Sequence, residues 1–341
     1  MNCHSKSIYA VARKAGCSPS TVSRVLTNSA RVRPDTRSRI LNAMREMKFI
    51  ARKRVPQIGI VVSNLSGARL TSYVSQLLRL VMLELVKRNC VIRVLNGENR
   101  MPENDDNFDA FISLAYDESV NHIVKNSSAP VISLNNPLAA ENFYNIYSDH
   151  RQSARIATEY LLTMGHRNIM MIGYKKSCGS IGDWGMLERT SAFSETLQRF
   201  GLRSDLIAYT DDEPLENILL RARAEGVTGI VAFSEDELRI PYLLSHVMKM
   251  RLPEEMSLVM EELPDVLDLT VPPVTAVKQP FTRMIDAIMS RLDKLLAGDY
   301  EQCAPVIFNN ELVIRGSVAR IGEAIRPPHR NDSPAAHFVT A

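Results

Sequence analysis

Five side chains between residues 18 and 24 have the chemistry needed to contact a nucleic acid. Four are the hydroxyls of Ser18, Ser20, Thr21 and Ser23, and the fifth is the guanidinium of Arg24. Hydroxyls and helix N-terminal N–H groups suit phosphate oxygens, whereas an arginine can bond bidentately to the major-groove edge of guanine. An ordinary solvated surface can carry the same residues, so the elements that hold them decide between the two interpretations.

Local signals place these residues at the start of a helix that follows a tight turn. Gly16 can end a preceding helix because glycine adopts the left-handed conformation cheaply, and Ser18 and Pro19 suit the N-cap and first helical position. Three apolar stripes predict three helices: Ile8, Val11, Ala12 and Ala15, then Val22, Val25 and Leu26, then Ile40, Met44 and Met47. Two short helices joined by a glycine-containing turn, the second polar on its outer face, predict a helix-turn-helix.

The charge distribution supports this prediction. Residues 1–56 contain thirteen Lys and Arg against two acidic residues, a net charge of +11, whereas the remainder of the chain carries −8. A small basic segment attached to an acidic body is typical of a domain that meets a polyphosphate. A solvated basic face is the alternative that charge alone leaves open.

The rest of the chain alternates short β-rich apolar runs with helical patterns. Strands are expected at 58–62, 91–95, 110–114, 130–134, 169–173, 229–234 and 257–260. Helices are expected near 72–87, 152–164, 187–200, 214–224, 236–250 and 283–296. This alternation predicts an α/β fold of parallel, doubly wound sheets.

The sequence offers little support for an enzyme or a cofactor. Gly173, Gly179 and Gly182 lack the spacing of a dinucleotide or Walker loop, and no serine lies in a GxSxG elbow. The seven histidines show no metal-site spacing, and the five cysteines lack CxxC pairs and are expected to be reduced. The sequence has neither an apolar signal core at its N-terminus nor a run long enough to span a bilayer. We therefore expect no cofactor, no membrane association and a cytoplasmic location.

The segment from Val11 to Asn28 resembles the LacI/GalR family of bacterial transcription repressors. The match includes Val11-Ala12-Arg13-Lys14-Ala15-Gly16 and Thr21-Val22-Ser23-Arg24-Val25-Leu26, and it continues through the body to about Ser317. The resemblance implies a three-helix helix-turn-helix head followed by a two-lobed, periplasmic-binding-protein-like body.

It implies these boundaries: a DNA-binding head at 1–49, a short basic linker at 50–57, and a body for effector binding and dimerisation at 58–320. The N-lobe comprises about 57–147 and 278–304, and the C-lobe about 148–277 and 305–320. Residues 321–341 are expected to be a disordered tail.

The resemblance also assigns DNA contacts. It implies that Pro19, Ser20 and Arg24 face base edges, while Ser18, Thr21, Ser23 and Asn28 meet phosphates. The linker departs from the family pattern because only eight residues precede the strand at Ile58 and Pro56 prevents a helix from running into it. Arg52, Lys53 and Arg54 are therefore expected to contact phosphates without inserting a side chain into the minor groove.

For the body, the resemblance implies a small-molecule effector, a sugar or a related metabolite, between the lobes. By position, Arg189 falls on the family's effector-binding arginine and Asp236 on an effector-binding aspartate, with Glu235 replacing the family's asparagine. Glu262 falls near a family aspartate, although Met260 and Glu261 replace the Gly-Phe before it. Trp184, the single tryptophan, is expected in a glycine-rich turn where it can stack on a sugar ring. Solvated surface charges and ordinary packing are the alternatives for these four residues.

The function predicted from the sequence is a sequence-specific transcriptional regulator that represses by binding a palindromic operator in double-stranded DNA as a homodimer. One head reads only a few base pairs, so specificity requires two heads on a symmetric site. One alternative is a dimeric regulator whose body no longer binds an effector, because residues 63–69 differ from the family's first loop. Another is a solute-binding protein, which would require a signal peptide and would lack the basic head.

Overall fold

The computed structural model divides the chain into two compact units, Met1–Val55 and Pro56–Ala341, called here the head and the body. It describes residues 8–26, 32–47, 55–62, 73–96, 108–115, 129–137, 143–174, 184–233, 238–262 and 267–322. Among these residues no helix combines the length and the apolar character needed to cross a membrane.

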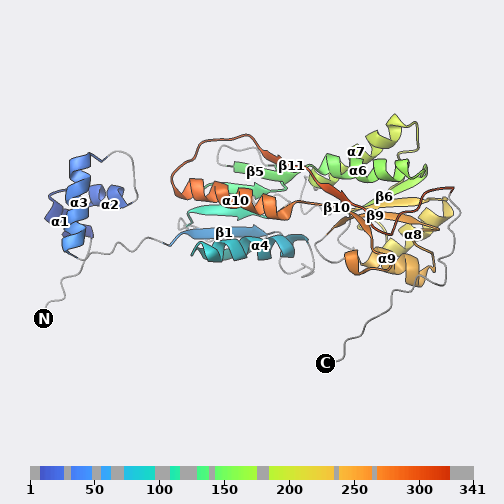
Figure 1. The fold of residues 1–341 in the computed structure, drawn as a ribbon, viewed down its shortest axis with the longest axis horizontal. Helices are drawn as coiled ribbons and strands as arrows, with labels where there is room; N and C mark the ends of the chain where they lie inside the picture. The colour runs from blue at the N-terminus through green and yellow to red at the C-terminus, as the bar shows by residue number, and fades with distance from the viewer. Residues whose placement is uncertain are drawn as a thin grey trace, which may run out of the picture. The chain divides into compact units, whose positions relative to one another are not determined.

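The head contains the three predicted helices, drawn in blue in Figure 1. They are α1 (Ile8–Ala15), α2 (Pro19–Leu26) and α3 (Pro34–Glu46). Their apolar stripes meet in a small core formed by Val11, Ala12, Ala15, Val22, Val25, Ile40 and Ala43. Gly16 separates α1 from α2 with a φ of +61°, a left-handed conformation that glycine adopts without steric cost.

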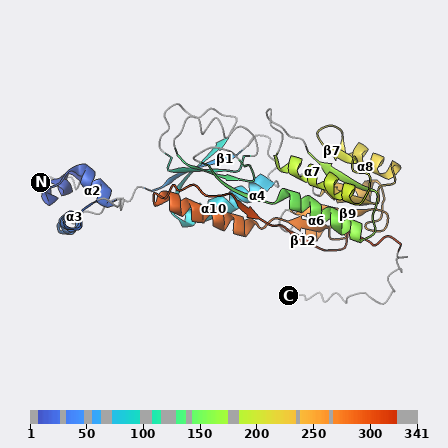
Figure 2. The same cartoon turned by 90° about the horizontal axis from the view of Figure 1, so that it is seen from above.

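The first half of the body is a six-stranded sheet in the order β11-β5-β4-β3-β1-β2, with all neighbours parallel. Its strands are β1 (Gln57–Val62), β2 (Val91–Asn96), β3 (Ala110–Ser113), β4 (Val131–Leu134), β5 (Phe143–Ser148) and β11 (Val306–Phe308). Helices α4 (Tyr73–Lys87) and α10 (Phe281–Leu296) bury their apolar faces on one side of this sheet, as Figures 1 and 2 show.

The second half of the body is a sheet in the order β12-β10-β9-β8-β6-β7, parallel except for β12. Its strands are β6 (Ile169–Gly173), β7 (Ile207–Tyr209), β8 (Gly229–Ala232), β9 (Ser257–Glu262), β10 (Thr275–Lys278) and β12 (Glu311–Val313). Helices α6 (His150–Thr163) and α7 (Trp184–Arg199) cover one face, and α8 (Leu215–Ala224) and α9 (Arg239–Tyr242) cover the other (Figure 1).

Burial on both faces explains the continuous apolar strands. In β6, Ile169 and Met171 pack under α6 and α7, whereas Met170 and Ile172 pack toward α8 and α9. Because successive side chains point to opposite faces, a strand covered on both sides must be apolar throughout. The α/β fold class of parallel, doubly wound sheets is therefore confirmed.

Several elements differ from the sequence-based expectation. Strands β5, β7, β10, β11 and β12 are absent from the strands expected from the apolar runs. The helix expected at 236–250 is the short α9 followed by a π-helical turn, η1 (Leu243–Val247). A 3-10 turn, η2 (Leu267–Leu269), precedes β10. Trp184 is the first residue of α7 and not part of a turn.

The chain passes between the two sheets three times. It crosses after β5, returns after β10 and crosses again between β11 and β12. Residues 305–320 were expected in the C-lobe, but Val306–Phe308 pairs with β5 in the first sheet, so the third crossing comes a few residues later. Asp149 and Asn310 join the first and third crossings, because the Asn310 side chain donates a 2.8 Å hydrogen bond to the carbonyl of Asp149.

Candidate functional site

The N-terminus of α2 gathers three hydroxyls. The Ser18 Oγ accepts a 3.2 Å hydrogen bond from the backbone N–H of Thr21, and it lies 2.8 Å from both the Ser20 Oγ and the Thr21 Oγ1. Ser18 therefore caps the helix, as its sequence position predicts. Helix N-terminal N–H groups and hydroxyls together favour an anionic oxygen.

Burial divides α2 into two faces. Val22 and Val25 lie in the core of the head, whereas Ser18, Ser20, Ser23 and Arg24 are exposed. Pro19 and Thr21 are partly buried. The outer face of α2 is therefore polar and carries a cation at its last turn, which is the arrangement of a recognition helix. Asn28, Arg52, Lys53 and Arg54 lie outside the described residues.

In the body, Arg189 is a buried cation on α7 with 3% exposure. Its Nη2 lies 2.5 Å from the Glu261 Oε1 on β9, and its guanidinium lies 5.0 Å from the centre of the Phe233 ring. Ion pairing and an aromatic face both stabilise a guanidinium removed from water.

A polar network continues from this ion pair. The Gln279 Nε2 donates a 2.7 Å hydrogen bond to the same Glu261 oxygen. The Gln279 Oε1 accepts 3.0 Å hydrogen bonds from the Asn135 Nδ2 and the Ser148 Oγ. The Asn135 Oδ1 in turn accepts a 2.8 Å hydrogen bond from the Ser148 N–H, and Asn135 also contacts the Tyr73 hydroxyl. The network links both sheets of the body.

Three rings adjoin the network. Trp184 lies edge-on to Tyr147 and His150, with ring centres 5.1 and 5.3 Å apart. Burial and the nearby Arg189 charge hold the pKa of His150 well below its usual range, so its imidazole is neutral near pH 7. The His150 Nδ1 has no hydrogen-bond partner among the described residues. Burial, Asp149 and Glu188 raise the pKa of Tyr147.

Four members of the network share one structural position, the carboxyl end of a parallel strand. Asn135 follows β4, Ser148 ends β5, Glu261 lies near the end of β9, and Gln279 follows β10. In open α/β sheets, ligands bind outside the carboxyl ends of the strands. Asn135 has a φ of +53°, a left-handed conformation that asparagine tolerates and that recurs at ligand sites.

The predicted effector residues are only partly described. Arg189 and Trp184 both lie on α7 beside the network. Asp236 lies outside the described residues, and Glu262 ends β9 with a side chain that is not described. Glu261, Gln279, Asn135 and Ser148 were not predicted as site residues. Asn135 and Glu261 directly follow predicted strands, which was an available signal, whereas the strands next to Ser148 and Gln279, β5 and β10, were not predicted.

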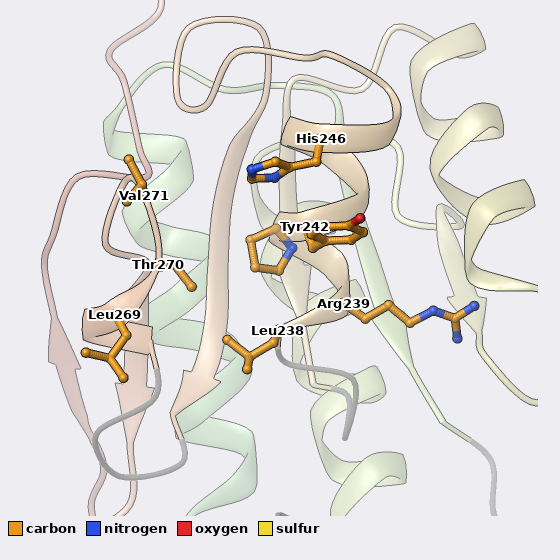
Figure 3. Close-up of a pocket in the computed structure, with 8 residues that line it drawn as sticks. Leu238, Arg239, Tyr242, His246, Leu269, Thr270 and Val271 are labelled. Carbon is orange, nitrogen blue, oxygen red and sulfur yellow. The ribbon is translucent and has the colours of Figure 1, made fainter.

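A second feature is an apolar groove on the C-lobe. Its lining residues are Leu238, Arg239, Pro241, Tyr242, His246, Leu269, Thr270 and Val271, around a volume of about 550 Å³. Figure 3 shows side chains of the helical segment and of residues 269–271 on opposite sides of this space. Tyr242 and His246 stack at 5.1 Å, and Leu269 and Val271 are 80% and 86% exposed. Apolar side chains this exposed mark an interaction surface.

The described residues contain no candidate metal site. No group of three or more His, Cys, Asp or Glu side chains gathers there in a way that could hold a metal ion.

Two family profiles match the chain. Residues 7–51 match bacterial regulatory proteins of the lacI family, and residues 158–318 match a periplasmic binding protein-like domain. The first match covers the helix-turn-helix of the head. The second covers most of the second half of the body, which contains Arg189, Glu261 and Gln279.

Similar proteins agree with these matches over nearly the whole chain. The chain is 26% identical to the HTH-type transcriptional regulator AscG of Escherichia coli (strain K12), over 90% of this chain and 97% of that protein. Among solved structures, it resembles a transcriptional regulator CelR–cellobiose complex, with a TM-score of 0.64, 24% identity and coverage of 91% and 99%. It also resembles the lac repressor dimer bound to operator and the anti-inducer ONPF, with a TM-score of 0.62, 18% identity and coverage of 92% and 99%. The two structural likenesses establish the fold.

Proposed function

Because the chain belongs to the lacI family of bacterial regulatory proteins, we propose that it represses transcription by binding a palindromic operator as a homodimer, under the control of a small molecule. Its relatives in this family are transcriptional regulators and not enzymes, and the chain is a DNA-binding regulator of the same kind. The palindromic operator, the dimer and the effector are the parts of the proposal that need experiments.

The observation that carries the DNA-binding proposal is the outer face of α2. Ser20 and Arg24 are exposed on a helix whose inner residues build the core of the head, and Ser18 caps its N-terminus. In this proposal Pro19, Ser20 and Arg24 face base edges, whereas Ser18, Thr21, Ser23 and Asn28 contact phosphates. Pro19 has no side-chain donor and contacts the bases through its apolar ring. Arg52, Lys53 and Arg54 add phosphate contacts from the linker.

Two substitutions separate base reading from phosphate contact. Arg24→Ala should weaken binding to the cognate operator by about 1–3 kcal/mol and relax the preference at one base pair. Lys53→Ala should weaken binding to cognate and to random DNA alike. It should also reduce the slope of log K against log salt concentration by about one. Fluorescence anisotropy at several salt concentrations measures both effects. Equal losses on cognate and random DNA for both variants would contradict the assignment of Arg24 to base reading.

Two exposed apolar surfaces support a homodimer formed by the body. The first lies on α4 and the edge strand β2 and consists of Met82, Leu83, Val86 and Val94, each 37–63% exposed. The second is the apolar groove. Surfaces of this kind are covered in stable homodimers, which bury more apolar area than transient complexes.

Sedimentation tests the dimer and its surfaces. The chain should sediment as a dimer at micromolar concentration, and Val86→Glu or Val271→Glu should shift it toward monomer because each places a charge in an apolar contact. Phe200→Glu is the matched control, since Phe200 is also exposed, at 57%, but lies outside both surfaces. A monomeric wild-type chain would contradict the proposal.

The effector proposal rests on Arg189, which lies buried among strand ends of the body. In this proposal the effector is a sugar or a related metabolite, bound by Arg189, Trp184, Asp236 and Glu262. CelR was solved in complex with cellobiose, so cellobiose is a suitable first member of a sugar panel. Arg189→Ala should abolish the ligand response while leaving operator binding intact, because the operator contacts belong to the head. A response that persists in this variant would contradict the role of Arg189.

One observation favours a second candidate function, a dimeric regulator whose body does not bind an effector. The guanidinium of Arg189 already pairs with Glu261 in the protein itself. In that case no member of the panel would raise the melting temperature of the body or change operator affinity. A ligand-dependent loss of operator binding would exclude this alternative.

A further inference from the structure

We propose that Glu261 determines the charge class of the effector, so that the site accepts a polyhydroxylated ligand without an anionic group and rejects carboxylates and phosphates. This inference rests on the proposed function, because it concerns the same effector site. Glu261 lies near the carboxyl end of β9, directly before the predicted effector residue Glu262. Its carboxylate pairs with Arg189, a buried arginine of the described body.

The Glu261 carboxylate already pairs with the Arg189 guanidinium, the group that would bind an anion. The Arg189 Nη2 lies 2.5 Å from the Glu261 Oε1, and the Arg189 side chain is 4% exposed against 18% for that of Glu261. A ligand that approaches from the solvent therefore meets the carboxylate more readily than the guanidinium. An acidic ligand would have to displace Glu261 from Arg189 and would then lie beside a second negative charge.

Glu261 cannot swing away without breaking a further contact. Gln279, which is 2% exposed, donates a 2.7 Å hydrogen bond to the same Glu261 oxygen. The other end of the Gln279 amide is held by Asn135 and Ser148 at 3.0 Å. The carboxylate is thus held from two sides, and networks of this kind fix the orientation of each member.

The remaining described groups add no net positive charge. Arg189 and Glu261 cancel, and His150 is neutral because burial and Arg189 lower its pKa. Both contacts of the Glu261 carboxylate within the described residues use Oε1. The second oxygen is an acceptor suited to a ligand hydroxyl or ammonium group. Trp184 and Tyr147, whose ring centres lie 5.1 Å apart, are the aromatic groups that we expect to pack on the apolar face of such a ligand.

The first test measures anion binding with inorganic phosphate and glucuronate, at constant ionic strength. Glu261→Gln keeps the size and the Gln279 hydrogen bond but releases the Arg189 charge. Its melting temperature should rise with either probe, with an affinity at least about tenfold higher than that of the wild type. The double variant Arg189→Met with Glu261→Gln is the matched control and should show no such rise. Equal responses of the wild type and Glu261→Gln, or none in Glu261→Gln, would overturn the proposal.

The second test uses the wild-type chain alone and does not depend on a variant that folds. The body is screened with glucose, glucosamine, glucuronate and glucose 6-phosphate, together with cellobiose and cellobionate. Wild-type binding of an acidic member at least as tight as that of its neutral counterpart would overturn the proposal. Binding restricted to neutral and amino sugars would support it. If no sugar changes operator affinity, the effector part of the proposed function fails, but the phosphate titration of Glu261→Gln still decides the role of Glu261.

Discussion

The head and the body differ in how each assembles its functional residues. In the head, all the described candidates for DNA contact lie within seven consecutive positions, Ser18 to Arg24, on one short helix. In the body, the network around Arg189 joins residues as far apart as Asn135 and Gln279, which are 144 positions apart. A local site depends on one helix and its cap, whereas a dispersed site depends on the packing of two whole sheets.

The stabilities of the two regions should differ accordingly. Within the described residues, the core of the head contains seven buried apolar residues, whereas the clusters between the sheets of the body and their helices contain more than a dozen each. Small domains bury a smaller fraction of their surface and are marginally stable. The following predictions test this comparison from the largest expected effect to the smallest.

Replacement of Ile40 by alanine should unfold the head and leave the body folded. Ile40 is fully buried in the core of the head, and truncation of such a residue costs about 2–5 kcal/mol. This loss is comparable to the whole stability of a domain of this size, so operator binding should fall at least about 100-fold. Calorimetry should show the loss of one transition.

The matched control for Ile40 is Ile288 on α10, which is also fully buried. Ile288→Ala should lower the transition of the body and leave that of the head unchanged. If either variant shifted both transitions equally, the head and the body would unfold as one cooperative unit, and the comparison would fail.

Arg189→Met should destabilise the body by about 2–3 kcal/mol. The substitution leaves the Glu261 carboxylate, 18% exposed, without its cationic partner, and breaking a fully buried pair costs about 3–5 kcal/mol. The additional change Glu261→Gln should recover most of the loss because it removes the uncompensated charge. Urea unfolding of the body measures the loss in the single variant and the recovery in the double variant.

An exposed ion pair provides the control for Arg189. Arg203 pairs with Asp205 at 2.6 Å and with Glu225 at 2.7 Å, but the Arg203 side chain is 52% exposed and those of its partners are 73% and 29% exposed. Arg203→Met should therefore change the unfolding free energy by less than about 1 kcal/mol. If Arg189→Met and the double variant Arg189→Met with Glu261→Gln had the same unfolding free energy, the ion pair would contribute nothing to stability.

The body should lose stability as the pH falls below about 6.5. Burial and Arg189 lower the pKa of His150 in the folded chain, so the unfolded chain takes up a proton that the folded chain does not. The unfolding free energy therefore decreases by up to about 1.4 kcal/mol per pH unit between the usual histidine pKa and the lowered one. His166, whose pKa burial also lowers, adds a smaller contribution.

A histidine variant separates these contributions. His150→Gln should flatten the pH dependence of urea unfolding between pH 6.5 and pH 5. An unchanged slope in His150→Gln would show that His150 takes up a proton in the folded body.

Ser18→Ala should destabilise the head by about 1 kcal/mol, since the variant loses the N-cap hydrogen bond to Thr21. Ser18→Asp should keep the cap and the stability but weaken operator binding, because it brings a negative charge to the proposed phosphate contact. Ser23→Ala, on the exposed face of α2, should change stability by less than about 0.5 kcal/mol. Thermal unfolding and operator titration of the three variants distinguish the cap from the DNA contact.

The sequence alone determined the head and the fold class of the body. Helix α2 was predictable because its signals are local: Gly16 for the turn, Ser18 for the cap and Val22 and Val25 for the inner face. The alternation of apolar strands with helical stripes predicted parallel, doubly wound sheets, and the family resemblance implied their division into two lobes. Strand β6 begins and ends at the predicted residues, because burial on both faces requires an uninterrupted apolar run.

The tertiary structure decided where the chain changes sheets and which polar residues meet. Strand β11 was missed because Val306 and Ile307 are exposed on an edge and carry no alternating pattern, and its pairing with β5 exists only in the folded sheet. Glu261 and Gln279 lie in segments whose sequence identifies them only as strand ends. Their contact with each other and with Arg189 results from the order β10-β9-β8-β6 and the packing of α7. Helix signals act over a few residues and can be read from the chain, whereas a site formed by strand ends depends on long-range pairing that no local pattern encodes.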